Sequence, residues 1–150
     1  MTSGQRMDEL ADLVGSELGV SDWQVVTQDQ VNLFADATGD HQWIHVDPER
    51  ARSGPFGQTI AHGFLTLALL PALLHDLALV DGYRLAVNYG LNRVRFPAPV
   101  PVGARIRARA ILKAAEAVAG GTQVVLESTV EVEGQDKPGC VAETVTRYYV

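Results

Sequence analysis

Residues 61–77 read AHGFLTLALLPALLHDL, and this apolar stretch decides the fold. A helix that is apolar nearly all round has no face for water, so it has to be buried on all sides. Pro71 lies inside the stretch, and a proline in a helix interior introduces a kink. We therefore expect a long central helix that other elements enclose.

After Gly82 the sequence alternates with the period of a β-strand. Residues 104–113 alternate alanine and isoleucine with arginine, and residues 123–133 alternate apolar residues with glutamate. Residues 83–96 and 140–150 read as two further strands. Successive strands with short turns pair antiparallel, and the apolar face of their sheet has to be covered. We therefore expect an α+β fold in which an antiparallel sheet curls around the helix of residues 61–77.

The N-terminal half is expected to be mainly helix and loop. Residues 6–18 have helical spacing of apolar positions, and residues 21–26 read as a short strand. Thr27 followed by Gln30 has the capping-box pattern, and Gly39 is a natural helix stop, which predicts a helix between them. Residues 40–58 show little periodicity and predict a long functional loop with one helical turn at residues 48–52.

Length and composition predict one globular domain over residues 1–150, with 47% hydrophobic and 20% charged residues. The wholly apolar part of residues 61–77, residues 64–74 broken only by Thr66, is far shorter than the roughly 20 residues of a membrane span. The N-terminus has no secretory signal pattern. The single cysteine, Cys140, excludes an internal disulfide and favours a reduced, cytoplasmic setting. A net charge of −6 argues against nucleic-acid binding.

The residues that carry chemistry are concentrated in two short segments. Asp40 and His45 lie five residues apart in the loop, so a carboxylate and an imidazole could handle one water proton between them. Gly63 follows at the start of the central helix, where a backbone N–H lacks an internal partner. Together they suit chemistry beside a carbonyl. The structural alternative is that Asp40 bonds loop amides and that His45 is a satisfied core histidine.

A metal site is the rival use of these residues. His41 and His45 are four residues apart, with Asp40, Asp47 and His62 as further possible ligands. Gly39 before and Pro48 after make a helical placement of the two histidines doubtful, and no paired metal motif supports the site. We therefore expect no metal and assign His62 a structural role, in which it bonds the loop or caps the helix near its start.

Residues 38–45 read TGDHQWIH, residues 61–63 read AHG, and residues 95–103 read RFPAPVPVG. These segments resemble the hydratase-2 signature of the MaoC-like family of (R)-specific enoyl-CoA hydratases and 3-hydroxyacyl-thioester dehydratases, and the likeness is greatest to the small NodN-like branch. The resemblance implies a hot-dog fold, a homodimer, and no metal or organic cofactor. Gln42 and Trp43 depart from the family's Asn-Pro; Gln42 could supply a similar amide, and Trp43 could hold the loop by packing.

The resemblance implies reversible hydration of a trans-2-enoyl-CoA or acyl-carrier-protein thioester to the (R)-3-hydroxyacyl thioester, in fatty-acid metabolism. Asp40 and His45 would hold the water, with the roles of acid and base left open, and the Gly63 N–H would bind the thioester carbonyl. Gln42 is a candidate substrate contact. Two alternatives remain, a hot-dog acyl-thioesterase and a non-catalytic acyl-thioester-binding protein.

The basic residues are confined mostly to residues 82–115, which hold seven cations and no acid. Arg105, Arg107 and Arg109 lie on one strand face, opposite Glu127, Glu131 and Glu133 of the next strand, so cross-strand ion pairs are expected. Arg93 and Arg95 have no acid near them in sequence and are candidates for the phosphates of coenzyme A. The alternative is a surface pair with an acid from the first 81 residues. The edge of strand 83–96 is expected to join two copies in a homodimer.

Overall fold

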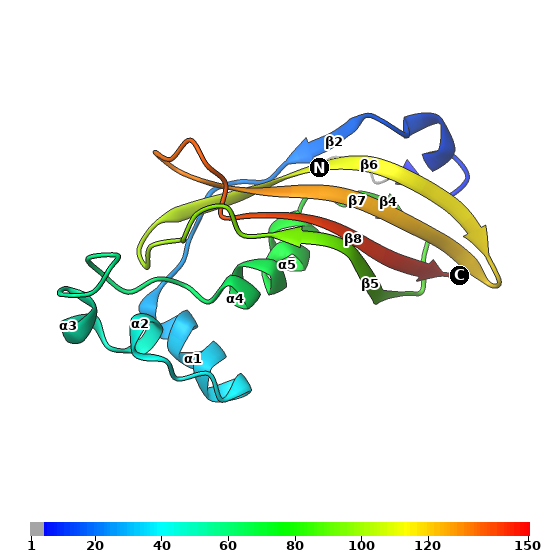
Figure 1. Cartoon of the computed structure of the whole chain (residues 1–150). Coiled ribbons are helices and arrows are strands. Elements are labelled where there is room, and N and C mark those ends of the chain that lie inside the picture. Colours follow the sequence, from blue (N-terminus) through cyan, green and yellow to red (C-terminus); the bar gives the residue numbers. More distant parts are fainter. Residues whose placement is uncertain (1–4) are drawn as a thin grey trace.

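A strongly curved antiparallel sheet lies over two short consecutive helices in the computed structural model, which describes residues 5–150 (Figure 1). The strands are β1 (Gln5–Arg6), β2 (Glu17–Val20), β3 (Gln24–Val25), β4 (Val80–Asp81), β5 (Leu85–Arg95), β6 (Arg105–Val118), β7 (Gly121–Val132) and β8 (Cys140–Tyr149). The helices are η1 (Leu10–Leu13, a 3-10 helix), α1 (Gln28–Thr38), α2 (Trp43–Val46), α3 (Pro48–Ala51), α4 (Gly63–Ala68) and α5 (Leu70–His75).

The main sheet has the strand order β2-β6-β7-β8-β5, with β3 also paired to β6. All of its pairs are antiparallel, while β1 and β4 form a separate parallel pair. The four long strands therefore lie where alternation predicted them. The sheet wrapped over helices confirms the expected hot-dog architecture.

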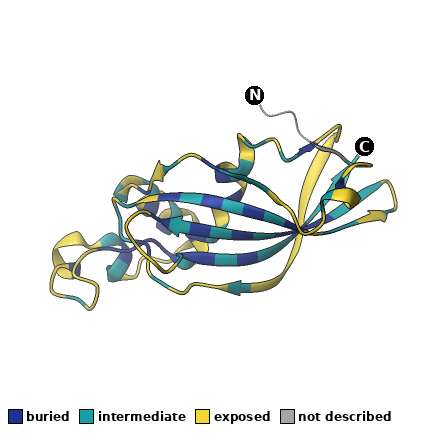
Figure 2. Ribbon diagram, turned by 90° about the horizontal axis from the view of Figure 1, so that it is seen from above, coloured by how far each residue is buried: buried dark blue, intermediate teal, exposed yellow. Residues whose placement is uncertain are grey.

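Alternation along the central strands decides which side chains face the helices. Ile106, Ala108 and Ala110 of β6 are buried, and the arginines between them lie on the outer face. Figure 2 shows buried and less buried residues alternating along these strands. The inner face closes over a core cluster that includes Val26, Val31, Leu65, Leu70, Leu73, Val130, Val132 and Cys140.

The central apolar stretch differs from the expected single helix buried on all sides. It breaks at Leu69 into α4 and α5, and Pro71 lies in the first turn of α5, where its missing N–H costs little. Leu65, Leu70 and Leu73 are buried. Phe64 is 71% exposed, and other residues on the same side of the two helices are exposed to solvent as well. The break lies two residues before Pro71, as expected of a proline kink. The expected burial on all sides was wrong, because the sheet covers one side of these helices only.

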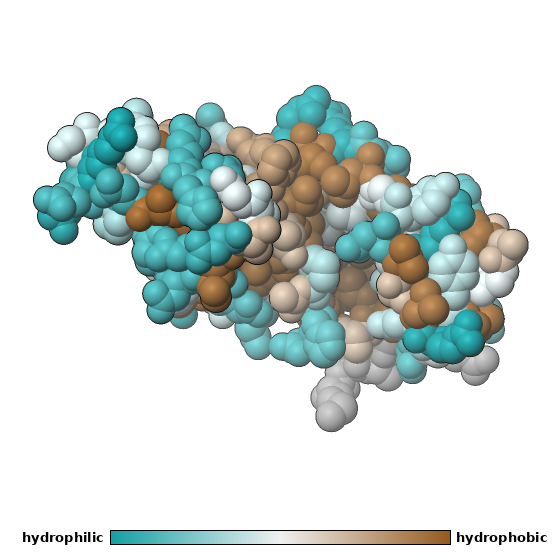
Figure 3. Space-filling model, turned by 90° about the horizontal axis from the view of Figure 1, so that it is seen from below, coloured by the Kyte–Doolittle hydropathy of each residue, from teal (hydrophilic) through white to brown (hydrophobic). Residues whose placement is uncertain are grey.

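An apolar groove occupies that uncovered side. It has a volume of about 890 Å³ between α4, α5 and the inner face of β5 and β8, and its walls include Phe64, Leu67, Leu74, Tyr83 and Leu91. Figure 3 shows the apolar surface that runs through this hollow on the underside of the molecule.

The N-terminal half partly departs from the expectation. Residues 6–18 form only the short η1 and then β2, because Gly15 takes a φ of +91° and residues 17–20 pair with β6. The helix α1 is confirmed at both ends: the Thr27 hydroxyl accepts from the Gln30 N–H, and Gly39 adopts a left-handed φ of +84°. The following loop contains the expected turn, α3, and a second short helix, α2, that periodicity did not reveal.

Among the described residues, no helix combines the length and apolarity that a membrane crossing requires.

Candidate active site

The fold brings together three side chains from three segments. Asp40 follows the Gly39 stop of α1, His45 lies in α2, and His62 directly precedes α4. One carboxylate oxygen and one nitrogen from each imidazole lie within 4.8 Å of one another. Asp40 is exposed, while His45 and His62 are 6% and 2% exposed. The structure thus places the two predicted catalytic side chains next to each other and adds His62.

His45 has a defined tautomer. Its Nδ1 lies 2.7 Å from the carbonyl oxygen of Ile60, and because a carbonyl can only accept, Nδ1 carries the hydrogen. The lone pair on Nε2 is left available, and Nε2 has no hydrogen-bond partner among residues 5–150. Burial lowers the pKa of His45 from 6.5, although the Ile60 bond and the Asp40 carboxylate oppose this. His45 is therefore neutral at neutral pH and can accept a proton.

Asp40 both holds the loop and presents a carboxylate. Its Oδ1 accepts from the Gln42 backbone N–H at 3.3 Å, and its carbonyl oxygen accepts from His62 Nε2 at 2.9 Å. The structural alternative for Asp40 is thus correct as far as it goes, because the side chain does bond a loop amide. One carboxylate oxygen is left for a ligand.

The residues in the family's Asn-Pro positions act differently from each other. Gln42 is exposed and holds the loop through its backbone N–H, and within the described structure its side-chain amide makes no hydrogen bond. Trp43 packs as expected: its ring lies against Gly54, where an added Cβ would come within 2.8 Å, and under the Arg50 guanidinium at 4.4 Å. Trp43 therefore fixes the loop after His45 by packing.

A glutamine that the sequence analysis missed holds the loop from α1. Gln28 donates from Nε2 to the His45 carbonyl at 2.7 Å and accepts from the Thr59 hydroxyl at 2.7 Å. It joins α1, α2 and the segment before α4. The only local signal was a polar residue in a first helical turn, which usually faces solvent, so the sequence could not have shown these contacts 17 and 31 residues away.

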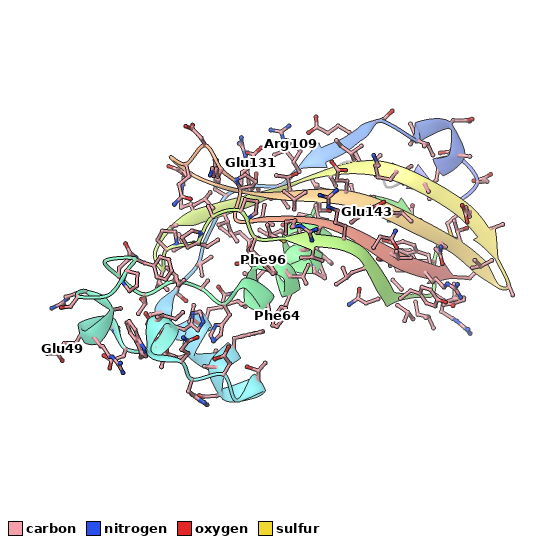
Figure 4. The ribbon with its side chains drawn as sticks, viewed as in Figure 1. Glu49, Phe64, Phe96, Arg109, Glu131 and Glu143 are labelled. Atoms are coloured by element: carbon pink, nitrogen blue, oxygen red, sulfur yellow. The ribbon has the colours of Figure 1, made fainter. Side chains whose placement is uncertain are left out.

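Gly63 is the first residue of α4, and its N–H has no hydrogen-bond partner in the part of the chain that the structure describes. The absent side chain matters for packing, because an added Cβ would lie 3.2 Å from the ring of Phe96. Phe96 also meets Phe64, a residue of the groove wall, edge to face with centroids 6.3 Å apart (Figure 4). The free amide thus lies next to two partly exposed aromatic rings.

Two ligands of the rival metal site are engaged elsewhere, and only Asp40, His45 and His62 of its five residues come together. His41 pairs with Asp36, and Asp47 caps α3 by accepting from the Arg50 N–H. The rings of His45 and His62 are stacked, with centroids 3.9 Å apart and planes 24° apart. Lone pairs in nearly parallel planes do not converge on one ion, as a tetrahedral site requires.

The arginines separate into two groups. On the outer face Arg105 pairs with Glu133, and Arg107 and Arg109 both pair with Glu131, as expected of cross-strand pairs; Figure 4 labels Arg109 and Glu131. Two pairs were not expected: Arg109 also meets Glu17 of β2, and Lys113 rather than an arginine meets Glu127. The Arg107 and Arg109 guanidiniums lower the pKa of Glu131. Arg93 and Arg95 are exposed and form no ion pair within residues 5–150, and Arg95 donates only to the Val94 carbonyl. Arg95 precedes Phe96, which contacts Gly63.

Comparison with known proteins agrees with this fold. A model of the MaoC like domain matches residues 9–135. The chain is 60% identical over 149 residues to 3-hydroxyacyl-thioester dehydratase Z of Mycobacterium tuberculosis, covering 99% of each chain. It is 47% identical over 137 residues to Nodulation protein N of Rhizobium leguminosarum bv. viciae, covering 89% of this chain and 84% of the relative. The solved (R)-hydratase from A. caviae, involved in PHA biosynthesis, superposes with a TM-score of 0.71 at 23% identity, over 89% of this chain and 94% of that one. The chain belongs to the MaoC-like domain family.

Proposed function

We propose that this protein catalyses the reversible hydration of trans-2-enoyl thioesters to (R)-3-hydroxyacyl thioesters in fatty-acid metabolism. One observation carries the proposal: the Asp40 carboxylate lies beside the neutral, buried His45, whose Nε2 is left free. The resemblance to a 3-hydroxyacyl-thioester dehydratase over 99% of both chains supports the same reaction.

In this mechanism the thioester carbonyl accepts a hydrogen bond from the Gly63 N–H, which draws electrons away from the β-carbon. The free Asp40 oxygen and His45 Nε2 hold one water. Nε2 takes a proton from that water as its oxygen bonds to the β-carbon, and the alkene electrons move to the carbonyl oxygen as an enolate. The proton then passes from the Asp40–His45 pair to the α-carbon, and the carbonyl re-forms.

The apolar groove suits the acyl chain. It begins at Phe64, beside the Gly63 amide, and continues along α5 and β5. Burying alkyl carbons there would contribute about 0.8 kcal/mol per methylene. Arg95, at the exposed end of β5 and next to Phe96, would bind phosphate groups of coenzyme A, together with Arg93 two residues before it.

We also propose a homodimer. The edge strand β5 is exposed along nearly all of its length and displays Leu85, Val87, Tyr89 and Leu91. An open apolar edge of this length invites pairing with a second copy. The single, buried Cys140 is consistent with a cytoplasmic location.

Turnover of enoyl-CoA thioesters from crotonyl to long-chain, followed by mass spectrometry and chiral analysis, tests the reaction. We expect addition of one water with the thioester intact and an (R)-3-hydroxyl product. Release of the free thiol would identify a thioesterase instead. No turnover with any chain length on coenzyme A or on acyl-carrier protein would favour a binding protein.

A further inference from the structure

We propose that His62 is a positioning residue, which holds Asp40 and His45 in one fixed arrangement. The inference rests on the proposed hydration and extends it, because His62 need not touch the substrate to act through its two neighbours. Its side chain makes one contact with each of them, and the two contacts come from different parts of the imidazole.

The first contact is a hydrogen bond to the backbone of Asp40. His62 Nε2 lies 2.9 Å from the Asp40 carbonyl oxygen, so Nε2 carries the hydrogen and donates it. Asp40 follows a glycine in the left-handed region, and its other hydrogen bonds are to Thr38 and Gln42 of the same exposed loop. The bond from a side chain that is 2% exposed ties this surface loop to the core.

The second contact is a ring stack on His45. The centroids lie 3.9 Å apart with 24° between the planes, and on α1 the ring of Phe34 lies 4.8 Å from His62. His62 is thus in contact with both α1 and α2. The stack restricts the rotation of the His45 ring, while the Ile60 carbonyl fixes its tautomer.

The remaining nitrogen shows that packing alone does not account for this histidine. Among the described residues, His62 Nδ1 is buried without a hydrogen-bond partner. A buried acceptor without a partner costs free energy that an apolar side chain of the same size would avoid. A residue that only filled space here would serve better as phenylalanine or leucine. The bond to Asp40 and the stack on His45 offset that cost.

Covalent connection adds a third link, because His62 directly precedes Gly63. The residue that binds Asp40 and His45 therefore also lies next to the amide proposed to bind the thioester carbonyl. One side chain thus sets the acid–base pair relative to the carbonyl, and a displacement of about 1 Å in such a geometry costs about 100-fold in rate.

Two variants separate the two contacts. His62→Phe keeps an aromatic face against His45 and removes the donor to Asp40, whereas His62→Gln keeps a donor and removes the ring. We expect each to lower kcat about 100-fold with KM changed less than about threefold. Ser128→Ala is the matched control: it removes another buried polar side chain without a partner, in β7, and should leave kcat unchanged.

An NMR titration of the four histidines gives a readout without substrate. The titratable groups that face His45 are Asp40 from the loop after α1 and His62 from the start of α4, and a charge on His62 would oppose a charge on His45. In His62→Phe the His45 titration should move to higher pH, and the Gln42 amide signal should shift as Asp40 loses its anchor.

Folded His62→Phe and His62→Gln proteins with wild-type kcat and an unchanged His45 titration would overturn the positioning role. A loss of activity that only follows a loss of folded protein would overturn it as well. If the wild type itself hydrates nothing while the His62→Phe titration shifts as expected, the proposed reaction fails and the positioning role stands.

Discussion

The Nδ1 of His45 lies 2.7 Å from the carbonyl oxygen of Ile60, so a backbone group 15 residues away decides which nitrogen of the candidate base is free. The same contact fastens α2 to the segment that leads into α4. One hydrogen bond thus sets the tautomer of the base and helps to hold the loop, and the pH dependence of the reaction tests the role of this base.

His45 should remain an unprotonated base below the pH at which a free histidine charges. Its pKa is lowered from 6.5, mainly by burial, so kcat/KM should fall only below pH 6.5. Below pH 6.5 the unfolded state binds more protons at this histidine than the folded state does. The contribution of His45 to the free energy of unfolding is therefore fully present above pH 6.5 and is lost as the pH falls. The pH profile of kcat/KM and denaturant unfolding at several pH values measure the two effects. A fall in kcat/KM centred above pH 6.5 would exclude His45 as the base.

Removing either member of the Asp40–His45 pair should abolish most of the turnover. We expect Asp40→Asn and His45→Gln each to lower kcat by at least about 100-fold, the scale of a positioned proton-transfer group. His41→Gln, an exposed histidine of the same segment that pairs with Asp36, is the control and should keep wild-type kcat. Near wild-type hydration by Asp40→Asn or His45→Gln in folded protein would show that the residue is not catalytic.

Arg95 should matter for coenzyme A and not for the fold. We expect Arg95→Ala to raise KM for an enoyl-CoA with a smaller effect on kcat, the signature of lost uniform binding. Arg107→Ala is the comparison, because Arg107 is already engaged by Glu131 and by the Trp23 ring at 4.3 Å. A truncated pantetheine thioester lacks the nucleotide phosphates, so the KM of Arg95→Ala for this substrate should be close to that of the wild type. Equal losses on both substrates would instead assign Arg95 to the scaffold.

The edge strand β5 should hold two copies together. Light scattering of the wild type should give twice the chain mass of 16.2 kDa. Val87→Lys places a charge on each copy at the edge and should shift the mass towards one chain. Leu33→Lys, at an exposed apolar position on α1, should leave the dimer intact. A wild-type monomer at micromolar concentration would refute β5 pairing.

Gly63 has little room for a side chain while Phe96 is present. In Gly63→Ala the new Cβ would lie 3.2 Å from the Phe96 ring, so we expect a loss of about 1–3 kcal/mol in stability and a lower kcat as the amide shifts. Adding Phe96→Leu should recover part of the stability, measured by denaturant unfolding. If the single variant is as stable and as active as the wild type, Phe96 does not constrain this position.

Local patterns identified those parts of the fold whose causes are local. The Thr27 cap and the Gly39 stop bound α1 as expected, and the alternation of β6 with arginine predicted both its buried face and its ion pairs. Residues 6–18 were misread because pairing with β6 and the left-handed Gly15 outweigh helical spacing. Spacing reports which residues share a face, but it does not report which element will bind that face.

The sequence by itself determined the sheet, the cap-to-glycine helix α1, and the Asp40 and His45 pair with its Gly63 neighbour. Only the tertiary structure decided that the two helices of residues 61–77 have one open side, that Gln28 holds the loop, and that the His62 ring stacks on His45. The reason is physical: capping and alternation act within a few residues, whereas these contacts join groups that meet only after the chain has closed around its core.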